Sequence, residues 1–110
     1  MYSYNGTAWS SASSRASAIG WGCGGGTATA AIGIGGTNNG AGTGAVATSE
    51  AYNGSTWAAD AAMATARFGP AGGGTSSTSV LVTAGKTGTT YQTSTEILSA
   101  GTATKTFTVA

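Results

Sequence analysis

Tyr52-Asn53-Gly54-Ser55-Thr56-Trp57 is the stretch that decides the fold, because Tyr4-Asn5-Gly6-Thr7-Ala8-Trp9 is nearly the same phrase placed 48 residues earlier. The chain is therefore an internal repeat. A period of this size falls in the range of propeller blades, roughly 40 to 50 residues, and not in that of the shorter helical or leucine-rich repeats.

The repeat continues beyond this phrase. A shift of 48 residues also places the glycine-rich run 24–27 on 72–75, and Ile32 and Ile34 on Val80 and Val82. The copies then drift, because Glu50 and Glu96 lie only 46 residues apart. Such deletions belong in surface loops, where a change of length costs little entropy. The 110 residues hold about two and a third repeats of 48 residues.

Small side chains dominate the composition. Gly, Ala, Ser and Thr supply 75 of the 110 residues, whereas Leu, Ile, Val and Phe supply 12, far fewer than in an ordinary globular domain. The net charge is only +1, so self-repulsion does not hold the chain open. A core of small residues buries little area against roughly 1 to 2 kcal/mol of backbone entropy per residue. We therefore expect that the chain is not stable as a lone monomer.

The Asn-Gly pairs predict β-hairpins with type I′ turns, in which both central residues have positive φ. Each hairpin places a tyrosine beside a tryptophan. Residues 58–67 have high helix propensity, but their counterparts at 10–19 do not, and we reject a helix there. We expect ten strands and essentially no helix, with the strands near 2–5, 7–12, 19–24, 29–35, 47–53, 55–60, 67–72, 79–84, 93–98 and 103–109.

Four features follow one another in the middle of the chain: a double glycine after an apolar run, a Glu-Ala-Tyr phrase, a tryptophan, and Met-x-x-x-Arg. Their residues are Gly35, Gly36, Glu50, Tyr52, Asn53, Gly54, Trp57, Met63 and Arg67. This order resembles the kelch-type propeller repeats, in the degenerate Gly/Ala/Thr-rich form found in phage and environmental virus proteins. In those repeats the double glycine ends the second strand, the tyrosine lies on the third and the tryptophan on the fourth.

The flanking copies are more worn. The first keeps Tyr4, Asn5, Gly6 and Trp9 but has Arg15 where Met63 falls and Ile19 where Arg67 falls. The last keeps Ala84-Gly85 and Glu96 but has Leu98 in place of the tyrosine.

The resemblance implies an all-β fold of four-stranded antiparallel blades around an axis. We expect one domain over 1–110, with a half blade at 1–18, a blade at 19–62 and a degenerate blade at 67–110, about two and a half blades in all. A closed propeller needs roughly four to eight. Either several copies complete a ring, with a dimer giving five blades, or the unit packs inside a larger assembly. We favour a homo-oligomer, because an open fragment leaves sheet edges unpaired.

The residue types argue against most chemistry. The G-x-G-x-x-G match at 20–25 and the related match at 40–45 open no helix that could hold a phosphate. With no histidine and one cysteine, Cys23, we expect no metal, no cofactor and no intrachain disulfide. The four basic residues cannot neutralise a phosphate track, so we expect no nucleic-acid partner. No apolar run is long enough to cross a membrane, and no signal peptide is visible.

Acid–base chemistry would have to use the carboxylates, which are Glu50, Asp60 and Glu96. Glu50 and Glu96 are repeat equivalents, so they occupy the same place in two blades and do not converge on one substrate. We interpret them as structural groups that bind turn amides or Arg67, and we expect no enzymatic activity.

Two aromatic residues lack aromatic counterparts in the repeat, Trp21 and Tyr91. They are the candidates for stacking on a sugar ring, with Asn38 and Asn39 as loop partners. From the resemblance we expect a structural or receptor-binding component of a virion or extracellular appendage. The alternative is an oligomeric, lectin-like module that binds cell-surface glycans.

Overall fold

The structure, a computed structural model, describes residues 1–39, 44–100 and 105–109. These residues form strands and connecting loops and no helix, and so no helix able to cross a membrane. The strands are β1 (Tyr2–Tyr4), β2 (Trp9–Ser11), β3 (Cys23–Thr27), β4 (Ala30–Ile34), β5 (Ser49–Tyr52), β6 (Trp57–Ala59), β7 (Ala71–Ser76), β8 (Ser79–Thr83), β9 (Lys86–Thr87), β10 (Thr90–Tyr91), β11 (Thr95–Ala100) and β12 (Lys105–Val109). The prediction of an all-β chain is confirmed.

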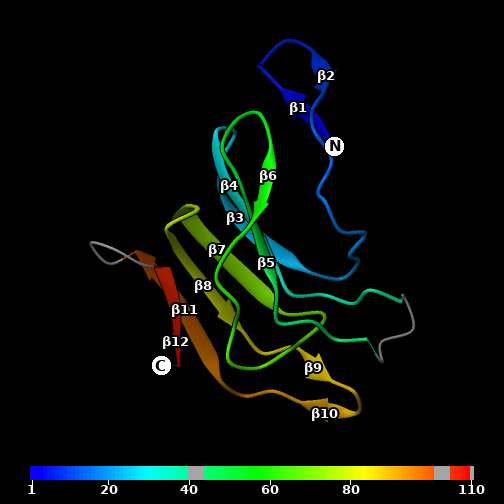
Figure 1. Ribbon diagram of the computed structural model, residues 1–110, viewed down its shortest axis with the longest axis vertical. Helices are drawn as coiled ribbons and strands as arrows, with labels where there is room; N and C mark the ends of the chain where they lie inside the picture. Colours follow the sequence, from blue (N-terminus) through cyan, green and yellow to red (C-terminus); the bar gives the residue numbers. More distant parts are fainter. Residues whose placement is uncertain (40–43, 101–104, 110) are drawn as a thin grey trace.

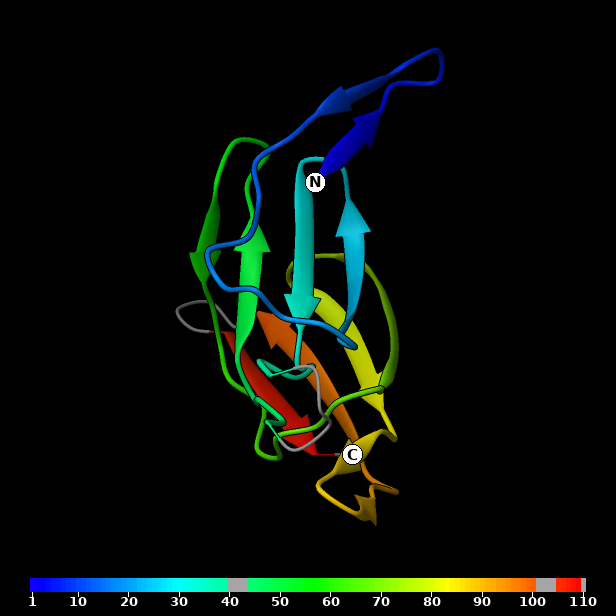
Figure 2. The ribbon, with the colours of Figure 1, turned by 90° about the vertical axis from the view of Figure 1, so that its right-hand side faces the viewer.

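Two four-stranded antiparallel sheets form the body of the molecule (Figure 1). The first has the order β3-β4-β5-β6 and the second the order β7-β8-β11-β12. Two further hairpins, β1–β2 and β9–β10, project at opposite ends of the long axis (Figures 1 and 2). No sheet among the described residues closes on itself.

The repeat is visible in the strand pairing, but its spacing changes within the sheet. Gly24 pairs with Gly33 in the first sheet, and Gly72 pairs with Val82 in the second. A bulge between Gly74 and Ser76 adds one residue, so the spacing is 48 on the first strand and 49 on the second. The alignment of Ile32 with Val80 is therefore wrong, and the structural equivalent of Ile32 is Leu81.

This slip matters because one residue moves a side chain to the other face of a sheet. Ile32 and Ile34 lie on one face of the first sheet, and Val80 and Val82 lie on the opposite face of the second. The two sheets thus pack face to back, as successive units of a stack. The buried cluster between them contains Ile32, Ile34, Met63, Val80, Val82 and Leu98, with Cys23, Ala47, Ala61 and Phe107 packed against it.

The glycine-rich strands β3 and β7 are the closest contact between the two sheets. A Cβ atom at Gly25 would lie 2.8 Å from the Gly74 nitrogen, and one at Gly72 would lie 2.7 Å from Cys23 Sγ. Glycine in a strand allows such a close approach of two backbones. The expected strands at 19–24 and 67–72 therefore start about four residues too early, because runs taken as loop are the packing strands.

Other expectations meet mixed outcomes. The rejection of a helix at 58–67 is confirmed, because only β6 and irregular backbone occupy this segment. The expected count of ten strands is wrong, since β9 and β10 form a small hairpin in what was taken as a loop. Gly35 and Gly36 follow β4, Tyr52 lies on β5, the third strand, and Trp57 on β6, the fourth.

The hairpins of the repeated phrase form, but their turns are not type I′. Tyr52 pairs with Trp57, with ring centroids 5.1 Å apart, and Tyr4 pairs with Trp9 at the same separation. Four residues connect the strands in each hairpin, and in each turn only the glycine has positive φ. The side chain of Asn53 instead accepts hydrogen bonds from the Ser55 and Thr56 amides, both at 2.9 Å. An asparagine that binds the backbone beyond it builds the turn without positive φ at its own position.

A buried arginine–glutamate pair ties each sheet to the segment before it. Arg67 Nη2 donates to Glu96 Oε2 at 2.8 Å with both side chains fully buried. The amides of Ala64 and Thr65 also donate to Glu96, which confirms its structural role as a carboxylate binding turn amides and Arg67.

The first sheet has the same device. Arg15 Nε donates to Glu50 Oε2 at 2.8 Å, and the Ala16 amide donates to Glu50 Oε1 at 2.9 Å. The counterpart of Arg67 is therefore Arg15 and not Ile19, because the segment before the first sheet is longer in sequence but makes the same ion pair.

Candidate functional site

Four chain segments meet at the end of the molecule that carries the β9–β10 hairpin (Figure 1). The Gly69 amide donates to the Trp21 carbonyl at 2.7 Å, which joins the segment before β3 to the segment before β7. Phe68 and Lys86 exchange two backbone hydrogen bonds of 2.9 Å, and the Gln92 amide donates to the Gly85 carbonyl at 2.9 Å. Backbone bonds therefore fix the walls of this site.

These segments enclose a shallow cleft of about 290 Å³. The Trp21 ring lies 5.8 Å from the Phe68 ring, and Lys86 Nζ lies 4.8 Å from the centre of the Tyr91 ring. Trp21 and Tyr91 remain 60% and 77% exposed, so their faces are available to a ligand. The lining residues are Trp21, Phe68, Gly69, Ala84, Gly85, Lys86, Tyr91 and Gln92. The structure thus brings together the two aromatic residues singled out in the sequence.

The cleft also contains unusual backbone. Among the described residues, the only non-glycine residues with positive φ are Trp21, at 56°, and Ala84, at 61°, and both line the cleft. Their counterparts in the other copy are glycines, Gly69 at 63° and Gly35 at 60°. A bulky residue in the left-handed region is strained by about 1 to 3 kcal/mol, and such strain gathers at functional sites. The tryptophan therefore stands at a position where a glycine would serve the fold better.

The groups in the cleft suit binding better than bond cleavage. Its lining offers aromatic faces, the Lys86 ammonium and the Gln92 amide, and it contains no carboxylate, cysteine or histidine. General acid–base or nucleophilic catalysis needs such groups within hydrogen-bonding reach of a substrate. A mostly apolar cleft with a few polar groups is typical of a small-ligand site.

Asn38 and Asn39 do not lie in this cleft, contrary to the expectation that they would join Trp21 and Tyr91. The Asn38 amide donates to the Gly44 carbonyl, and Thr37 Oγ1 donates to Asn39 Oδ1 at 2.9 Å. Thr37 itself pairs with Gly20 and Ala45. Both asparagines therefore belong to the connection between β4 and β5, and not to the wall of the cleft.

The remaining reactive side chains are scattered. Burial raises the pKa of the Cys23 thiol, with the positive charge of Arg67 acting in the opposite direction, so the thiolate is scarce at neutral pH. Asp60 accepts a hydrogen bond from the Ala61 amide. In the described part of the chain, no group of three or more Cys, Asp and Glu side chains is placed to hold a metal ion.

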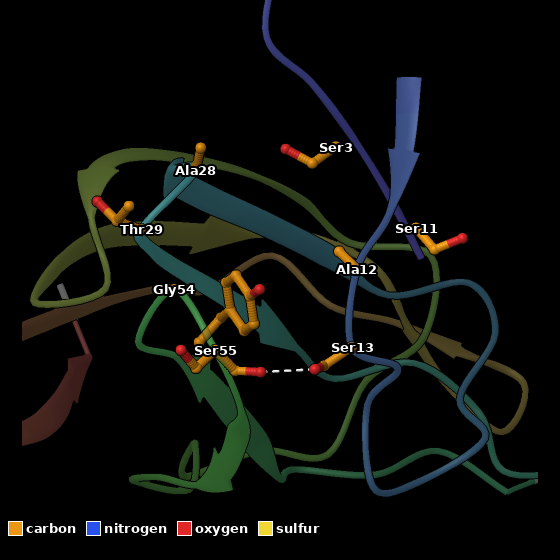
Figure 3. A pocket seen from close by; sticks show the side chains of 9 residues that line it. Ser3, Ser11, Ala12, Ser13, Ala28, Thr29, Gly54 and Ser55 are labelled. Carbon is orange, nitrogen blue, oxygen red and sulfur yellow. Dashed lines mark hydrogen bonds between the residues drawn. The ribbon is translucent and has the colours of Figure 1, made fainter. Parts of the chain in front are cut away.

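A second hollow lies between the β1–β2 hairpin and the turns of the first sheet (Figure 3). It measures about 740 Å³ and is open to solvent. Ser13 Oγ donates to the Ser55 carbonyl across it at 2.5 Å. The walls are mostly small, and Tyr52, the one aromatic, is nearly buried. Without an exposed ring or a charge, this hollow has little to orient a ligand.

Sequence reasoning did not identify Phe68, Lys86 or Gln92 as members of the site. Phe68 and Lys86 are neighbours only through an isolated bridge between residues 18 positions apart, which no local pattern announces. One signal was present for Trp21: the alignment at 48 residues pairs it with Gly69, and so marks a bulky residue at a glycine position.

No protein-family model matches this chain, and no curated protein is significantly similar to it in sequence.

Proposed function

We propose that the chain is a non-enzymatic, carbohydrate-binding module whose site is the cleft between Trp21 and Tyr91. The observation that supports this proposal most is the strained backbone of Trp21, which holds an exposed indole at a position that is a glycine in the other copy. Strain of this kind persists only where the surrounding structure maintains it. A ligand-binding role gives a reason for it.

The geometry matches the chemistry of a sugar ring. A pyranose has an apolar face of C–H groups, which packs on an aromatic ring, and a rim of hydroxyls, which needs hydrogen-bonding partners. Trp21 and Tyr91 supply the rings, and Gln92 supplies a donor and an acceptor. A volume of about 290 Å³ lies at the lower end of ligand pockets, about 300 to 1,000 Å³. This size favours one or two sugar rings at the end of a glycan.

The charge in the cleft favours an acidic sugar. Lys86 is the only charged residue in the lining, and its ammonium lies over the face of Tyr91. A carboxylate on the sugar would form a charge-assisted hydrogen bond with this ammonium. We therefore propose a uronic or sialic acid as the ligand, in preference to a neutral hexose.

Calorimetric titration with glucuronic acid, sialic acid and glucose tests this function. We expect saturable binding of at least one acid, weaker binding of glucose, and a loss of about tenfold or more in Trp21→Gly. Trp9→Gly is the matched control, because Trp9 is also an exposed tryptophan, at 69%, and lies outside the cleft. Equal binding by the two variants, or no binding of any of the sugars, would rule the site out.

A second proposal concerns assembly. We propose that the two sheets are consecutive blades of a kelch-like propeller that is completed by other copies, as part of a virion or an extracellular appendage. The face-to-back packing of two repeat-related sheets favours blades, and the β1–β2 hairpin favours incompleteness, because it corresponds to the outer strands β5 and β6 of a full sheet. Electron microscopy of the purified chain would display ring-shaped particles if this is right, and isolated small particles if it is not.

A further inference from the structure

The two sheets of the repeat differ in what covers one face. In the first sheet this face contains Ile32 and Ile34, which are buried by the second sheet. The equivalent face of the second sheet contains Leu81, the counterpart of Ile32, and Ile97, which pairs with it. These side chains are 43% and 40% exposed. The second sheet therefore presents, uncovered, the surface that is an interface in the first.

The glycine strands show the same difference. Gly25 pairs with Ile32, and Gly73 pairs with Leu81, so Gly25 and Gly73 are equivalent. A Cβ at Gly25 would lie 2.8 Å from the backbone of β7, whereas a Cβ at Gly73 would meet no atom within 4 Å. Around Gly73, Leu81 and Ile97 lies an apolar groove of about 200 Å³. The groove is the place where a further glycine strand would fit.

We propose that this face of the second sheet binds a second copy of the chain, head to tail, through the back face of that copy's first sheet. The proposal rests on the proposed self-assembly and names its interface. The interface would continue the one already present between the two sheets of each chain. A heterologous contact of this kind either closes into a ring or grows into a filament.

The geometry limits the size of a ring. Each copy adds two four-stranded sheets, so a closed ring contains an even number, four from two copies or six from three. Both numbers lie in the range of known propellers, four to eight blades. The incoming sheet takes the place of the β1–β2 hairpin, whose hydrogen bonds in the described structure lie within residues 1–12. The hairpin can therefore move aside without loss of bonds to the sheets.

Sedimentation equilibrium of the full chain and of Gly73→Ala tests the interface. The substitution fits the isolated chain, because no atom lies within 4 Å of the new methyl group. In the interface the methyl group would meet a backbone, as it would at Gly25. We expect the wild-type chain to form species of two or three times 10.4 kDa, and Gly73→Ala to weaken this association by about tenfold or more.

Leu81→Ser and Val109→Ser provide a second, independent pair. Both residues are exposed aliphatic side chains of the second sheet, but Val109 pairs with Glu96 and so lies on the opposite face. Leu81→Ser should weaken association and Val109→Ser should not. An oligomer that is indifferent to both Gly73→Ala and Leu81→Ser would overturn this interface while leaving self-assembly standing. A wild-type chain that stays monomeric at high concentration would overturn both.

Discussion

At the scale of single residues, Trp21 is where fold and function conflict. Its backbone has a φ of 56°, a conformation that costs an L-residue about 1 to 2 kcal/mol. Its ring packs against Phe68 and is otherwise exposed. A residue retained at a cost to the fold is expected to serve something other than stability.

We predict that Trp21→Gly leaves the free energy of unfolding within about 1 kcal/mol of the wild type. The relief of strain offsets the lost contact with Phe68 and the greater freedom of glycine in the unfolded chain. Urea denaturation followed by circular dichroism measures this change. A loss above about 2 kcal/mol would mean that Trp21 is a packing residue.

The two arginine–glutamate pairs differ in burial, and this gives a second prediction. Arg67 and Glu96 are completely buried, whereas the Arg15 side chain is 21% exposed. Glu96→Gln leaves an uncompensated buried charge, which costs about 3 to 5 kcal/mol. Glu50→Gln should cost about 1 to 2 kcal/mol, because solvent reaches its partner. Urea denaturation of the two variants compares them, and equal losses would contradict the burial difference.

Much of the residue-level pattern could be predicted from the sequence, and the exceptions have one cause. The roles of Glu96 and Arg67, and the partnership of Trp21 with Tyr91, follow from asking which residues repeat and which do not. Asn38 and Asn39 were misplaced, and Lys86 was overlooked, because their neighbours are set by how loops fold back and not by the repeat.

At the scale of elements, the hairpins were easier to predict than the glycine strands. Alternating aromatic residues around Asn-Gly identify a hairpin whatever its turn type. By contrast, runs such as 24–26 and 72–74 are typical of loops in an isolated chain. They become strands here because each packs on the other, which is a tertiary effect that no local propensity contains.

The turn asparagines give a third prediction, since the same turn occurs in two settings. Asn53→Ala removes two side-chain hydrogen bonds from a hairpin that belongs to the first sheet. It should lower the stability of the chain by about 1 kcal/mol. Asn5→Ala removes the same bonds from the detached hairpin and should leave the main unfolding transition unchanged. Thermal denaturation of both variants decides this, and a loss in Asn5→Ala as large as in Asn53→Ala would show that the β1–β2 hairpin is part of the cooperative unit.

At the scale of the whole molecule, the candidate site exists because two copies of the repeat meet. Trp21 precedes the first sheet, Phe68 precedes the second, and Tyr91 comes from the hairpin inserted in the second. The same stacking that forms the cleft leaves one sheet face bare. Binding and assembly are therefore two consequences of one arrangement, at different ends of the stack.

The central claim is that a sugar binds at Trp21, and the chain has three tryptophans to report on it. Trp9 is exposed in the β1–β2 hairpin, and Trp57 Nε1 donates to the Ser13 carbonyl at 2.9 Å. The direct measurement is an NMR titration of the three indole N–H signals with glucuronic acid or sialic acid. The account predicts that the Trp21 signal shifts and saturates while those of Trp9 and Trp57 stay in place. A titration in which no indole signal moves, or in which Trp9 moves and Trp21 does not, would contradict it.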